Sequence, residues 1–384
     1  MKHVSLREVA AINPPAHDLS DESTVSFVGM AGLDDASGRV VDERMTLYGD
    51  VRKGYRPFKA GDVLVAKITP CFENGKIGLA TIENEYGAGS TEFHILRPDE
   101  NLDARYLSHL LRHPHFREVG KLRMTGSGGQ RRVPADYLSK CKIPLPGSSE
   151  QRRIADILDK ADAIRAKRRE AIAHLDSLAQ SIFHAMFGDP VTNTKAWPTV
   201  ALSELGTLDR GVSKHRPRND PRLLGGPHPL VQTGDVANAG GYLADHSSSY
   251  SDFGLSQSRM WPAGTLCITI AANIAKTSIL MFDACFPDSV VGFNSTKDQV
   301  EFVRHWFKFL QEIIERKAPE SAQKNINLAI LRSLQVIDPP RVRKQEFARR
   351  VRAIEAQRTR LLAAQKAEDE LFASLQNRAF KGEL

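Results

Sequence analysis

Apolar residues recur along two long stretches of this chain at alternating spacings of four and three positions. The first stretch covers residues 150–188 and the second covers residues 344–382, and neither contains a proline or a glycine before its last residue. This spacing is the heptad pattern of a coiled coil, so each stretch predicts one long helix. Forty helical residues extend about 60 Å, which is longer than a globular part of ordinary size is wide.

The predicted seam of the two helices is apolar near the ends and polar in the middle, where Arg165 and Arg168 occupy seam positions of the first helix. We expect the two helices to pair with each other in an antiparallel coiled coil. A parallel pair, packing of each helix on its own globular part, and pairing between two molecules are the alternatives. The apolar seam positions are Ile154, Leu158, Ile172, Leu175 and Ile182 in the first helix and Phe347, Val351, Ile354, Leu361, Phe372 and Leu375 in the second.

The segments before the two helices predict mixed α and β structure. "DVLVAKIT", "EFHILRP", "GTLCITIAA" and "VVGFNST" are short apolar, β-branched runs bounded by turn residues, which is typical of strands. "ARYLSHLLRHPHF" and "VEFVRHWFKFLQEIIER" have helical periodicity instead. Each segment has about 150 residues, enough for a core of its own.

The sequence is written twice. An offset of 193 residues pairs Phe187 with Phe380 and Gln130 with Gln323, while "HVSLREVAAI" resembles "TVALSELGTL" and "FKAGDVLVAKITPC" resembles "WPAGTLCITIAANI". Self-similarity at a fixed distance predicts two equivalent structural units. The offset varies inside the globular segments, so the two copies differ there by insertions.

We therefore predict an α+β protein with two globular domains in a pseudo-two-fold arrangement, separated by two long helices that form an antiparallel coiled coil. The expected boundaries are a first globular domain at 1–148, a first helix at 149–189, a second globular domain at 190–340 and a second helix at 341–384. "GDPVTNTKAWP", at 188–198, is rich in turn residues and follows the first helix.

Composition and charge exclude several classes of protein. The chain has 41% hydrophobic and 26% charged residues, no apolar run long enough for a membrane span, and no export signal at its start, so we expect a cytoplasmic protein. Its four cysteines form no CxxC pair, and its twelve histidines show no metal-ligand spacing, so we predict no metal site. A net charge of +7 fits a partner that is a polyanion.

"GDVLVAKITPCFENGKIGLA", "KIPLPGSSEQRRIADILDKADAIRAKRREAIAHLDSLAQSIFHAMFGDP" and "NRAFKGEL" together resemble the specificity subunit of type I restriction–modification systems. The resemblance extends over essentially the whole chain. The second long helix departs from the usual pattern, because it begins with "PRVRKQEFARRVRAIEAQ" rather than a "PPLEEQ" sequence.

The resemblance implies a subunit without catalysis that binds double-stranded DNA and reads a target of two unlike halves. It implies two methyltransferase subunits as partners, and motor and nuclease subunits bound through them. S-adenosylmethionine, ATP and magnesium are then expected on those partners rather than on this chain.

Motifs for catalysis are missing from the sequence itself. Neither a glycine-rich strand–turn–helix for S-adenosylmethionine nor a GxxxxGK[ST] motif for ATP is present. "NPPA" at 13–16 and "DPPR" at 338–341 lack the aromatic fourth residue of the adenine methyltransferase loop, so we interpret both as strand ends closed by prolines.

Two loops of each domain have the composition of a nucleic-acid contact. Glutamine side chains pair with adenine, and cationic side chains bind phosphate or guanine. In the first domain the candidates are Lys67, Thr69, Asn74, Lys76, Ser127, Gln130, Arg131 and Arg132. In the second they are Arg210, Lys214, Arg216, Arg218, Asn273, Lys276, Gln323, Lys324 and Asn325. A charge run is often only a solvated surface, and Phe72 in the first loop is equally consistent with the core.

Two other functions stay open on the sequence alone. The coiled coil would suit a scaffold whose globular domains bind ligands other than DNA, and that scaffold would show no preferred DNA sequence. A stand-alone methyltransferase or nuclease is the second alternative, and it would transfer methyl groups or cut DNA without another subunit.

Overall fold

The computed structural model describes residues 2–16, 18–127, 129–271, 274–317 and 326–384. Contacts within the chain divide it into two compact units. Unit 1 contains Met1–Ala171 and Leu361–Leu384, and unit 2 contains Ile172–Arg360. Each unit thus combines one globular part with about half of each long helix, which are α5 (Ser148–Phe187) and α11 (Arg341–Lys381).

Unit 1 has two four-stranded sheets and a two-stranded ribbon in its described residues. The first sheet has the order β2-β9-β6-β7, and the second has the order β4-β3-β8-β5, with β3 and β8 parallel. The ribbon pairs β1 with β10. The strands are β1 Lys2–Ser5, β2 Ala10–Ile12, β3 Thr24–Val28, β4 Arg44–Leu47, β5 Arg56–Lys59, β6 Val63–Ala66, β7 Ile77–Leu79, β8 Tyr86–Gly89, β9 Phe93–Pro98 and β10 Lys142–Leu145. The short helices are η1 Leu6–Glu8, α1 Tyr48–Val51, α2 Ala104–Arg112, α3 Pro114–Leu122 and α4 Ala135–Lys140.

The predicted strands of unit 1 are present, and the segment with helical periodicity contains a break. All four residues of β6 are buried, because both faces of its sheet are covered, which explains the continuous apolar run in the sequence. "ARYLSHLLRHPHF" forms α2 and the start of α3. The break lies at His113, since Pro114 lacks an N–H and disfavours helical backbone in the residue before it.

Unit 2 repeats this topology. Its sheets have the orders β12-β20-β17-β18-β14 and β15-β13-β19-β16, with β13 and β19 parallel, and its ribbon pairs β11 with β21. The strands are β11 Thr199–Ala201, β12 Thr207–Arg210, β13 Leu224–Leu230, β14 Tyr242–Leu243, β15 Ser248–Tyr250, β16 Met260–Trp261, β17 Leu266–Thr269, β18 Thr277–Leu280, β19 Ala284–Cys285, β20 Val290–Asn294 and β21 Gln335–Ile337. The helices are α6 Leu202–Leu205, η2 Pro221–Leu223, α7 Thr233–Asn238, α8 Asp252–Ser256, α9 Lys297–Lys317 and α10 Leu328–Ser333.

The duplication extends to single hydrogen bonds. The amide of Leu6 donates to the carbonyl of Cys141 at 2.9 Å, and the amide of Leu202 donates to the carbonyl of Leu334 at 2.9 Å. These pairs have the offsets found in the sequence. The structure therefore confirms two equivalent units, with β14 as an addition in unit 2 and the uninterrupted α9 in place of α2 and α3.

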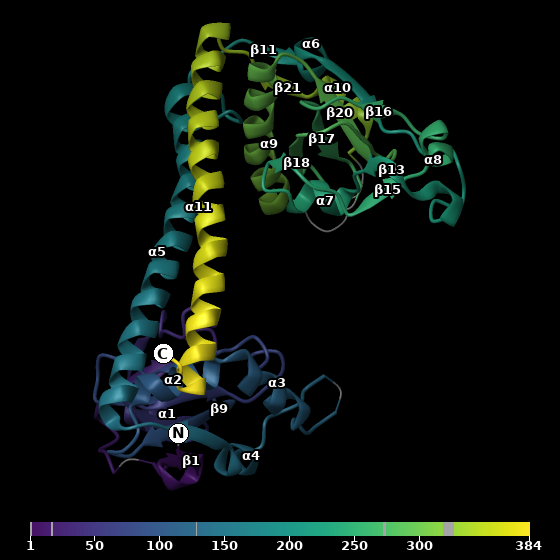
Figure 1. Ribbon diagram of the computed structural model, residues 1–384. Helices are drawn as coiled ribbons and strands as arrows, with labels where there is room; N and C mark the ends of the chain where they lie inside the picture. Colours follow the sequence, from purple (N-terminus) through teal and green to yellow (C-terminus); the bar gives the residue numbers. More distant parts are fainter. Residues whose placement is uncertain (1, 17, 128, 272–273, 318–325) are drawn as a thin grey trace. The chain divides into compact units, whose positions relative to one another are not determined.

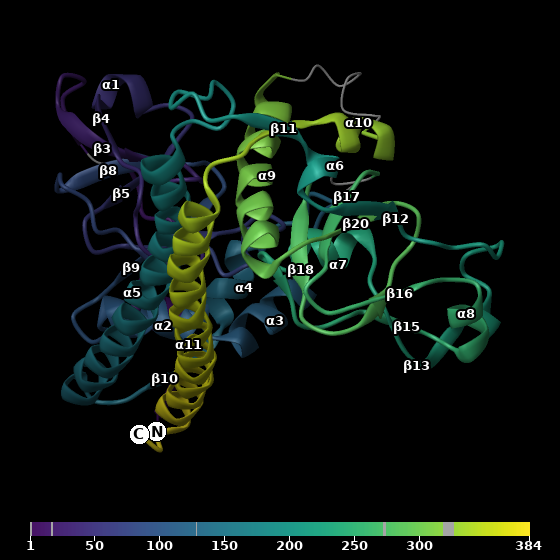
Figure 2. The same ribbon diagram turned by 90° about the horizontal axis from the view of Figure 1, so that it is seen from above.

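The long helices pair in an antiparallel manner within each unit, as Figures 1 and 2 show for α5 and α11. In unit 1, Arg165 contacts Asp369 at 2.7 Å, while Arg153 near the start of α5 donates to the carbonyl of Leu384 at 2.6 Å. In unit 2, Arg358 contacts Asp176 at 3.0 Å. The residue number thus falls along α11 as it rises along α5, and the predicted antiparallel pairing is confirmed.

Polar seam positions pair with opposite charges on the other helix. Arg168 meets Glu368 at 2.6 Å, and the guanidinium of Arg165 also lies 4.3 Å from the ring centre of Phe372. Arg165 bonds to Asp162 on its own helix as well. The polar middle of the predicted seam is therefore a set of matched charges.

Each globular core includes one end of both long helices. In unit 1, Ile154 and Leu158 of α5 belong to the same buried cluster as Phe372 of α11, Val63 of β6 and Leu96 of β9. In unit 2, Phe347 and Val351 of α11 cluster with Phe183 of α5. The ends of the helices therefore complete the globular cores in addition to pairing with each other. Ile172 is buried, whereas Leu175, Ile182, Ile354, Leu361 and Leu375 are half-buried.

No helix among the described residues is long and apolar enough to cross a membrane.

Candidate functional site

Two loops that are far apart in the sequence form one site in unit 1. The loop after β6 and the loop before α4 are joined by a hydrogen bond from the amide of Thr69 to the carbonyl of Arg131, at 2.9 Å. The amide of Val133 donates to the carbonyl of Lys67 at 2.8 Å, and Ile68 forms a β-bridge with Arg132. The structure therefore brings together the two sets of candidates that the sequence presented separately.

The imidazole of His94 on β9 hydrogen-bonds to the loop before α4. Its Nε2 lies 2.8 Å from the carbonyl of Val133, and its Nδ1 lies 3.1 Å from the side-chain amide nitrogen of Asn13. Because a carbonyl only accepts, Nε2 carries the proton and Nδ1 accepts. Burial lowers the pKa of His94, so the ring is neutral near pH 7 and holds this hydrogen-bond pattern.

Two carboxylates outside the predicted candidates, Glu92 and Glu73, hold the cations of the site. Arg132 donates Nε and Nη2 to Glu92, at 3.0 and 2.9 Å, and Lys67 lies 3.9 Å from the same carboxylate. Hydrogen bonding from Arg132 lowers the pKa of Glu92, and burial lowers the pKa of Lys67. Arg131 lies 3.7 Å from Glu73 and its side chain is 43% exposed. Arg131 is thus the loosely held cation, and Arg132 is the fixed one.

Arg132 positions the tip of its loop. Its Nη1 donates to the carbonyl of Gln130 at 3.2 Å, while the amide of Gln130 donates to the carbonyl of Ser127. The side chain of Gln130 is exposed at this tip. An amide group on a braced loop suits recognition of an adenine edge, because a glutamine pairs with N6 and N7 of that base.

The remaining candidates of unit 1 divide between surface and structure. Asn74 is exposed, whereas Thr69 donates its hydroxyl to Glu73 at 3.1 Å. Lys76 donates its ammonium to the carbonyls of Met30 and Leu33, at 3.1 and 2.7 Å, so it supports the loop that contains them. Phe72 is fully buried in the core, which decides between the two interpretations of this residue.

The basic loop of unit 2 is organised by acids. Arg216 and Arg218 both pair with Asp288, and the Nε of Arg210 donates to the carbonyl of Asp288 at 2.8 Å. Asp220 pairs with Arg222 at 2.8 Å. Lys214 is exposed and makes no ion pair among the described residues. The loop therefore presents several cations at fixed positions rather than a mobile run of charge.

The second loop of unit 2 is described only in part. Lys276 immediately precedes β18, and its backbone amide donates to the hydroxyl of Thr269 at 3.1 Å. The other candidates of this region, which are Asn273, Gln323, Lys324 and Asn325, lie outside the described residues.

The acids that organise both sites have no local signal in the sequence. Glu92 lies 40 residues from Arg132, and Asp288 lies 70 residues from Arg218. Their pairing follows from the sheet order, which brings the start of β9 beside the loop before α4 in unit 1. The internal repeat could have indicated which loops meet, but not which acid pairs with which cation.

The two proline-containing motifs have structural roles. Asn13 follows β2 with a φ of 51°, and its side-chain oxygen accepts from the amide of Ile95 at 3.1 Å. Asp338, which precedes α11, pairs at 2.7 Å with Lys344 in the first turn of that helix. Among the described residues, no group of three or more His, Cys, Asp or Glu side chains is placed to hold a metal ion.

Residues 1–174 and 194–370 match the type I restriction modification DNA specificity domain. The chain belongs to this family. The two matched segments contain the two globular parts and most of the two long helices, so the family match follows the duplication.

Individual relatives of the specificity-domain family agree with this assignment. The type I restriction enzyme EcoEI specificity subunit of Escherichia coli is 38% identical over 159 residues, which are 41% of this chain and 27% of that protein. The aligned part thus spans about a quarter of the length of this relative.

Solved structures show the same fold. The type I restriction–modification system S subunit from M. genitalium has a TM-score of 0.61 at 13% identity, covering 99% of this chain and 96% of that chain. A chain from a structure of the type I R-M system has a TM-score of 0.57 at 16% identity, covering 100% of this chain and 98% of the other.

Proposed function

We propose that this chain is the non-catalytic, cytoplasmic DNA-specificity subunit of a type I restriction–modification complex and reads a bipartite, asymmetric target. The observation that carries this proposal is the match of the specificity domain to both halves of the chain. Each unit would read one half of the target.

The charges and amides of the two sites support this division of labour. In unit 1, Arg131 is available for a phosphate, while Arg132 braces the loop from which Gln130 would read a base. In unit 2, Asp288 holds Arg216 and Arg218 in fixed positions, as expected for arginines that contact the backbone at a defined register. Because the loops of the two units differ in sequence, the two half-sites should be unrelated.

The partners follow from the same proposal. Two methyltransferase subunits would bind S-adenosylmethionine and modify adenine, and motor and nuclease subunits would bring ATP and magnesium. This chain would recognise the target sequence in the DNA and hold the two methyltransferase subunits. The altered start of α11 makes unequal binding of the two methyltransferase subunits an expectation of the proposal.

Sequencing of modified adenines tests this function directly. DNA is methylated by the purified chain together with its methyltransferase subunit and S-adenosylmethionine, and the target is read from the modified sites. With Gln130→Ala, we expect relaxed preference at one position of one half-site, by about 1–3 kcal/mol of discrimination, and no change in the other half. Arg210→Gln in unit 2 is the matched variant and should affect only the second half-site.

The long helices are proposed to set the spacing between the half-sites. Removing one heptad from the middle of both helices shortens each by about 10 Å, which corresponds to about three base pairs of DNA. We expect a spacer reduced by that amount in the methylated target. An unchanged spacer would contradict this role of the helices without affecting sequence reading.

Two outcomes would replace the proposal by its alternatives. Methyl transfer by the chain without a second subunit would make it an enzyme. DNA binding without any preferred sequence, together with binding of a partner protein that is insensitive to salt, would make it a scaffold.

A further inference from the structure

Two cations of unit 1 meet at one edge of the interface between its two sheets. Lys67 directly follows β6, and Arg56 is the first residue of β5. Because side chains alternate along a strand, Arg56 shares one face of β5 with Phe58, which packs in the same cluster as Ala66 and Phe93. Arg56 therefore points toward the sheet from which Lys67 emerges.

The backbone holds both residues beside the connection between β8 and β9, at 90–92. Arg56 is paired with Gly89, the last residue of β8. The amide of Lys67 donates at 2.9 Å to the carbonyl of Glu92, which immediately precedes β9. The carbonyl of Lys67 accepts from the amide of Val133 at 2.8 Å. The positions of the two cations are thus fixed by separate strands.

These two cations lack matching negative charges. The side chain of Lys67 is only 16% exposed, and its ammonium lies 3.9 Å from Glu92, too far for a hydrogen bond. Glu92 already accepts hydrogen bonds from Arg132. The half-buried guanidinium of Arg56 makes no ion pair and no hydrogen bond within the part of the chain that the structure describes. One carboxylate thus serves three cations, and shielded charges without a partner are costly.

The pKa of Lys67 shows this crowding of positive charge. Burial lowers the pKa of Lys67, Glu92 opposes this effect, and the charges of Arg56 and Arg132 lower it further. An anion between Arg56 and Lys67 would relieve the repulsion. A phosphate diester carries a negative charge on two non-bridging oxygens, so it is able to accept hydrogen bonds from both cations.

Unit 2 does not repeat this arrangement. The repeat that pairs "FKAGDVLVAKITPC" with "WPAGTLCITIAANI" places Ile270 at the position of Lys67, and Ile270 is buried in the core of unit 2. Arg56 has a counterpart in Arg259, but Arg259 lies 3.4 Å from the carboxylate of Asp209. The cation that remains in unit 2 therefore has an acid of its own.

The acid that pairs with Arg259 is itself a difference between the units. The offset that pairs "HVSLREVAAI" with "TVALSELGTL", continued by one residue, places Asn13 at the position of Asp209. Asn13 is neutral, and its side chain bonds to His94 and to the amide of Ile95. A lysine for an isoleucine and an amide for a carboxylate both make unit 1 more positive at this place.

We propose that Arg56 and Lys67 together bind one backbone phosphate of DNA, at a site that unit 2 does not possess. That the phosphate belongs to DNA rests on the proposed function, whereas the anion site rests on the two cations without matching charges. Arg132 connects Glu92 to the loop of Gln130, so the site adjoins that loop. The phosphate contact then fixes the register in which Gln130 meets its base.

Binding of the full chain to a random-sequence duplex, measured by fluorescence anisotropy, tests the site first. Arg56→Gln and Lys67→Met should each weaken binding about fivefold. In the double variant, the slope of the logarithm of the binding constant against the logarithm of salt concentration should become shallower by about one unit, because the slope counts phosphates rather than cations. A change of about two units would indicate two separate phosphates, and unchanged binding would indicate none; either result would overturn the proposal.

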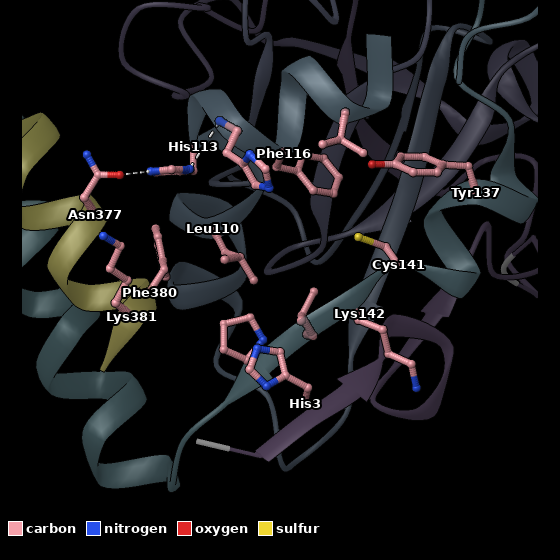
Figure 3. Close-up of a pocket in the computed structure, with 14 residues that line it drawn as sticks. His3, Leu110, His113, Phe116, Tyr137, Cys141, Lys142, Asn377, Phe380 and Lys381 are labelled. Carbon is pink, nitrogen blue, oxygen red and sulfur yellow. Dashed lines mark hydrogen bonds between the residues drawn. The ribbon is translucent and has the colours of Figure 1, made fainter. Parts of the chain in front are cut away.

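Arg259→Gln and Lys142→Gln are the matched controls. Arg259 is the paired counterpart of Arg56, while Lys142 is exposed on β10 beside a cavity of about 710 Å³ that Phe116 and Phe380 also line (Figure 3). Each variant removes one positive charge outside the proposed site, so we expect less than a twofold change. A fivefold loss with Lys142→Gln would attribute the effect to net charge. The same loss with Arg259→Gln would contradict a site specific to unit 1.

A neutral phosphate analogue locates the contact on the DNA. The target read from the methylated sites is synthesised with a methylphosphonate at one backbone position at a time, and binding of the complex with the methyltransferase subunit is measured. At one position of the half-site that Gln130→Ala alters, we expect a loss of about fivefold for the wild-type chain and of less than twofold for the double variant. Equal losses in both proteins at every position would contradict the shared phosphate contact.

Acetylation of lysines by acetic anhydride separates DNA from other anions. The reaction of Lys67, followed by mass spectrometry with Lys142 as the reference, should slow at least threefold when the duplex is bound. Inorganic phosphate and polyglutamate at the same ionic strength should protect Lys67 less. Equal protection by inorganic phosphate would assign the site to a free anion, and equal protection by polyglutamate would assign it to an acidic protein segment. Both outcomes would overturn the proposal.

The stability of unit 1 distinguishes a binding role of Lys67 from a structural one. Because burial lowers the pKa of Lys67, its charged form costs free energy in the folded chain at pH 7, and this cost is lost as pH rises through the folded pKa. Hydrogen exchange of β6 and β9 in Lys67→Met should therefore be slower or unchanged. Faster exchange would show that Lys67 stabilises the fold through Glu92, against the proposal.

Failure of this proposal and failure of the proposed function give different results. Sequence-specific methylation, together with unchanged duplex binding by the double variant, would overturn the phosphate site alone. Weaker duplex binding by the double variant, in a chain that directs no sequence-specific methylation, would contradict the proposed function and leave the phosphate site in place.

Discussion

Unit 1 and unit 2 share one strand order but stabilise the ends of the long helices with different chemistry. In unit 2 the rings of Phe183, Phe187 and Phe347 contact one another, with centres 5.0–5.5 Å apart. In unit 1 the ring of Phe372 lies 6.4 Å from the imidazole ring of His109, and the guanidinium of Arg165 stacks on it. The comparison shows that a duplicated backbone tolerates different packing, provided that each helix end completes a core.

The units also differ in their buried charges. Unit 2 contains a closed network in which Arg304 donates to Glu301 at 2.6 Å, Tyr242 donates to Glu301 at 2.6 Å, and His305 lies against Phe347. Arg304, Glu301 and His305 are all at most 3% exposed. Unit 1 holds its buried Asp62 and Asp162 with arginines that are partly exposed, which are Arg97 at 2.7 Å, Arg112 at 3.1 Å and Arg165 at 2.8 Å. Unit 2 should therefore respond more strongly to pH and to loss of a partner.

The largest effect is expected from the aromatic cluster. Phe347→Ala should lower the free energy of unfolding of unit 2 by about 3–5 kcal/mol, because it leaves a cavity in a fully buried site. All three tryptophans, Trp197, Trp261 and Trp306, belong to unit 2, so urea unfolding followed by tryptophan fluorescence reports on this unit.

The matched variant in unit 1 is Phe372→Ala. We expect a loss nearer the lower end of that range, because Phe372 is 7% exposed and its surroundings can relax. Hydrogen exchange of β6 and β9 should detect this loss while tryptophan fluorescence stays unchanged. If both variants shift the urea midpoint of the tryptophan fluorescence transition equally, the two units do not unfold separately.

The next largest effect is the pH dependence of unit 2. Burial, with a further contribution from Arg304, lowers the pKa of His305 to about 4, while hydrogen bonds and Arg304 lower the pKa of Glu301 to about 2 against the effect of burial. Both groups bind protons less readily in the folded state, so stability falls as pH falls. The loss from His305 begins below its unfolded value of 6.5 and is on the order of 3 kcal/mol by pH 4.

A further loss from Glu301 follows between pH 4.5 and about 2. Urea unfolding by tryptophan fluorescence at pH 7.5, 5.5 and 4 measures the first part. His305→Gln should remove most of it, whereas His174→Gln, on the exposed face of α5, should leave it unchanged. A pH profile that His305→Gln does not alter would assign the acid sensitivity to another group.

A smaller effect is expected from the acids that hold the cations of the two candidate sites. Asp288→Asn releases Arg216 and Arg218, so the binding free energy for non-specific DNA should become more favourable by about 1 kcal/mol. The slope of the logarithm of the binding constant against the logarithm of salt concentration should become steeper by about one unit. Glu92→Gln should do the same through Lys67 and Arg132.

Binding to a random duplex at several salt concentrations measures both changes. Asp252→Asn removes one negative charge from a residue that pairs with His228 rather than with an arginine, and controls for net charge. The same steepening in all three variants would mean that only the net charge matters.

The smallest effect is expected at the seam. A double-mutant cycle of Arg168→Ala and Glu368→Ala in unit 1 should give a coupling of about 0.5–1 kcal/mol, because this pair is partly shielded, at 28% and 19% exposure. Arg358 and Asp176 in unit 2 should couple less, since Asp176 is 54% exposed. Urea unfolding by circular dichroism measures both, and a stronger coupling in unit 2 would reverse the order.

Much of the fold could be predicted from the sequence because its signals are periodic and repeated. The heptad spacing predicts the long helices, and the repeat predicts two equivalent units. Pro114 carries the signal for the break at His113 that separates α2 from α3. The heptad spacing places Ile182 in the seam, whereas the structure buries its neighbour Phe183 completely. The ring of Phe347, 5.4 Å away, packs on Phe183, and the sequence does not show that contact.

The candidate site was predictable only in part. The two loops of unit 1 were selected by composition, but their contact through Thr69 and Arg131 depends on the sheet order. Lys76, one of the predicted cations, donates its ammonium to two carbonyl groups of the chain. Composition indicates which side chains are able to bind a polyanion, and it does not indicate which of them the fold has already engaged.

The sequence by itself determined the helices, the duplication and the α+β class, because periodicity is a property of neighbouring residues and a repeat is found by comparing the two halves of the sequence directly. Only the tertiary structure decided that Glu92 and Asp288 organise the cations and that each core takes in an end of both helices. The physical reason is distance along the chain: ion pairs and cores join residues tens to hundreds of positions apart, and only the folded backbone brings those residues into contact.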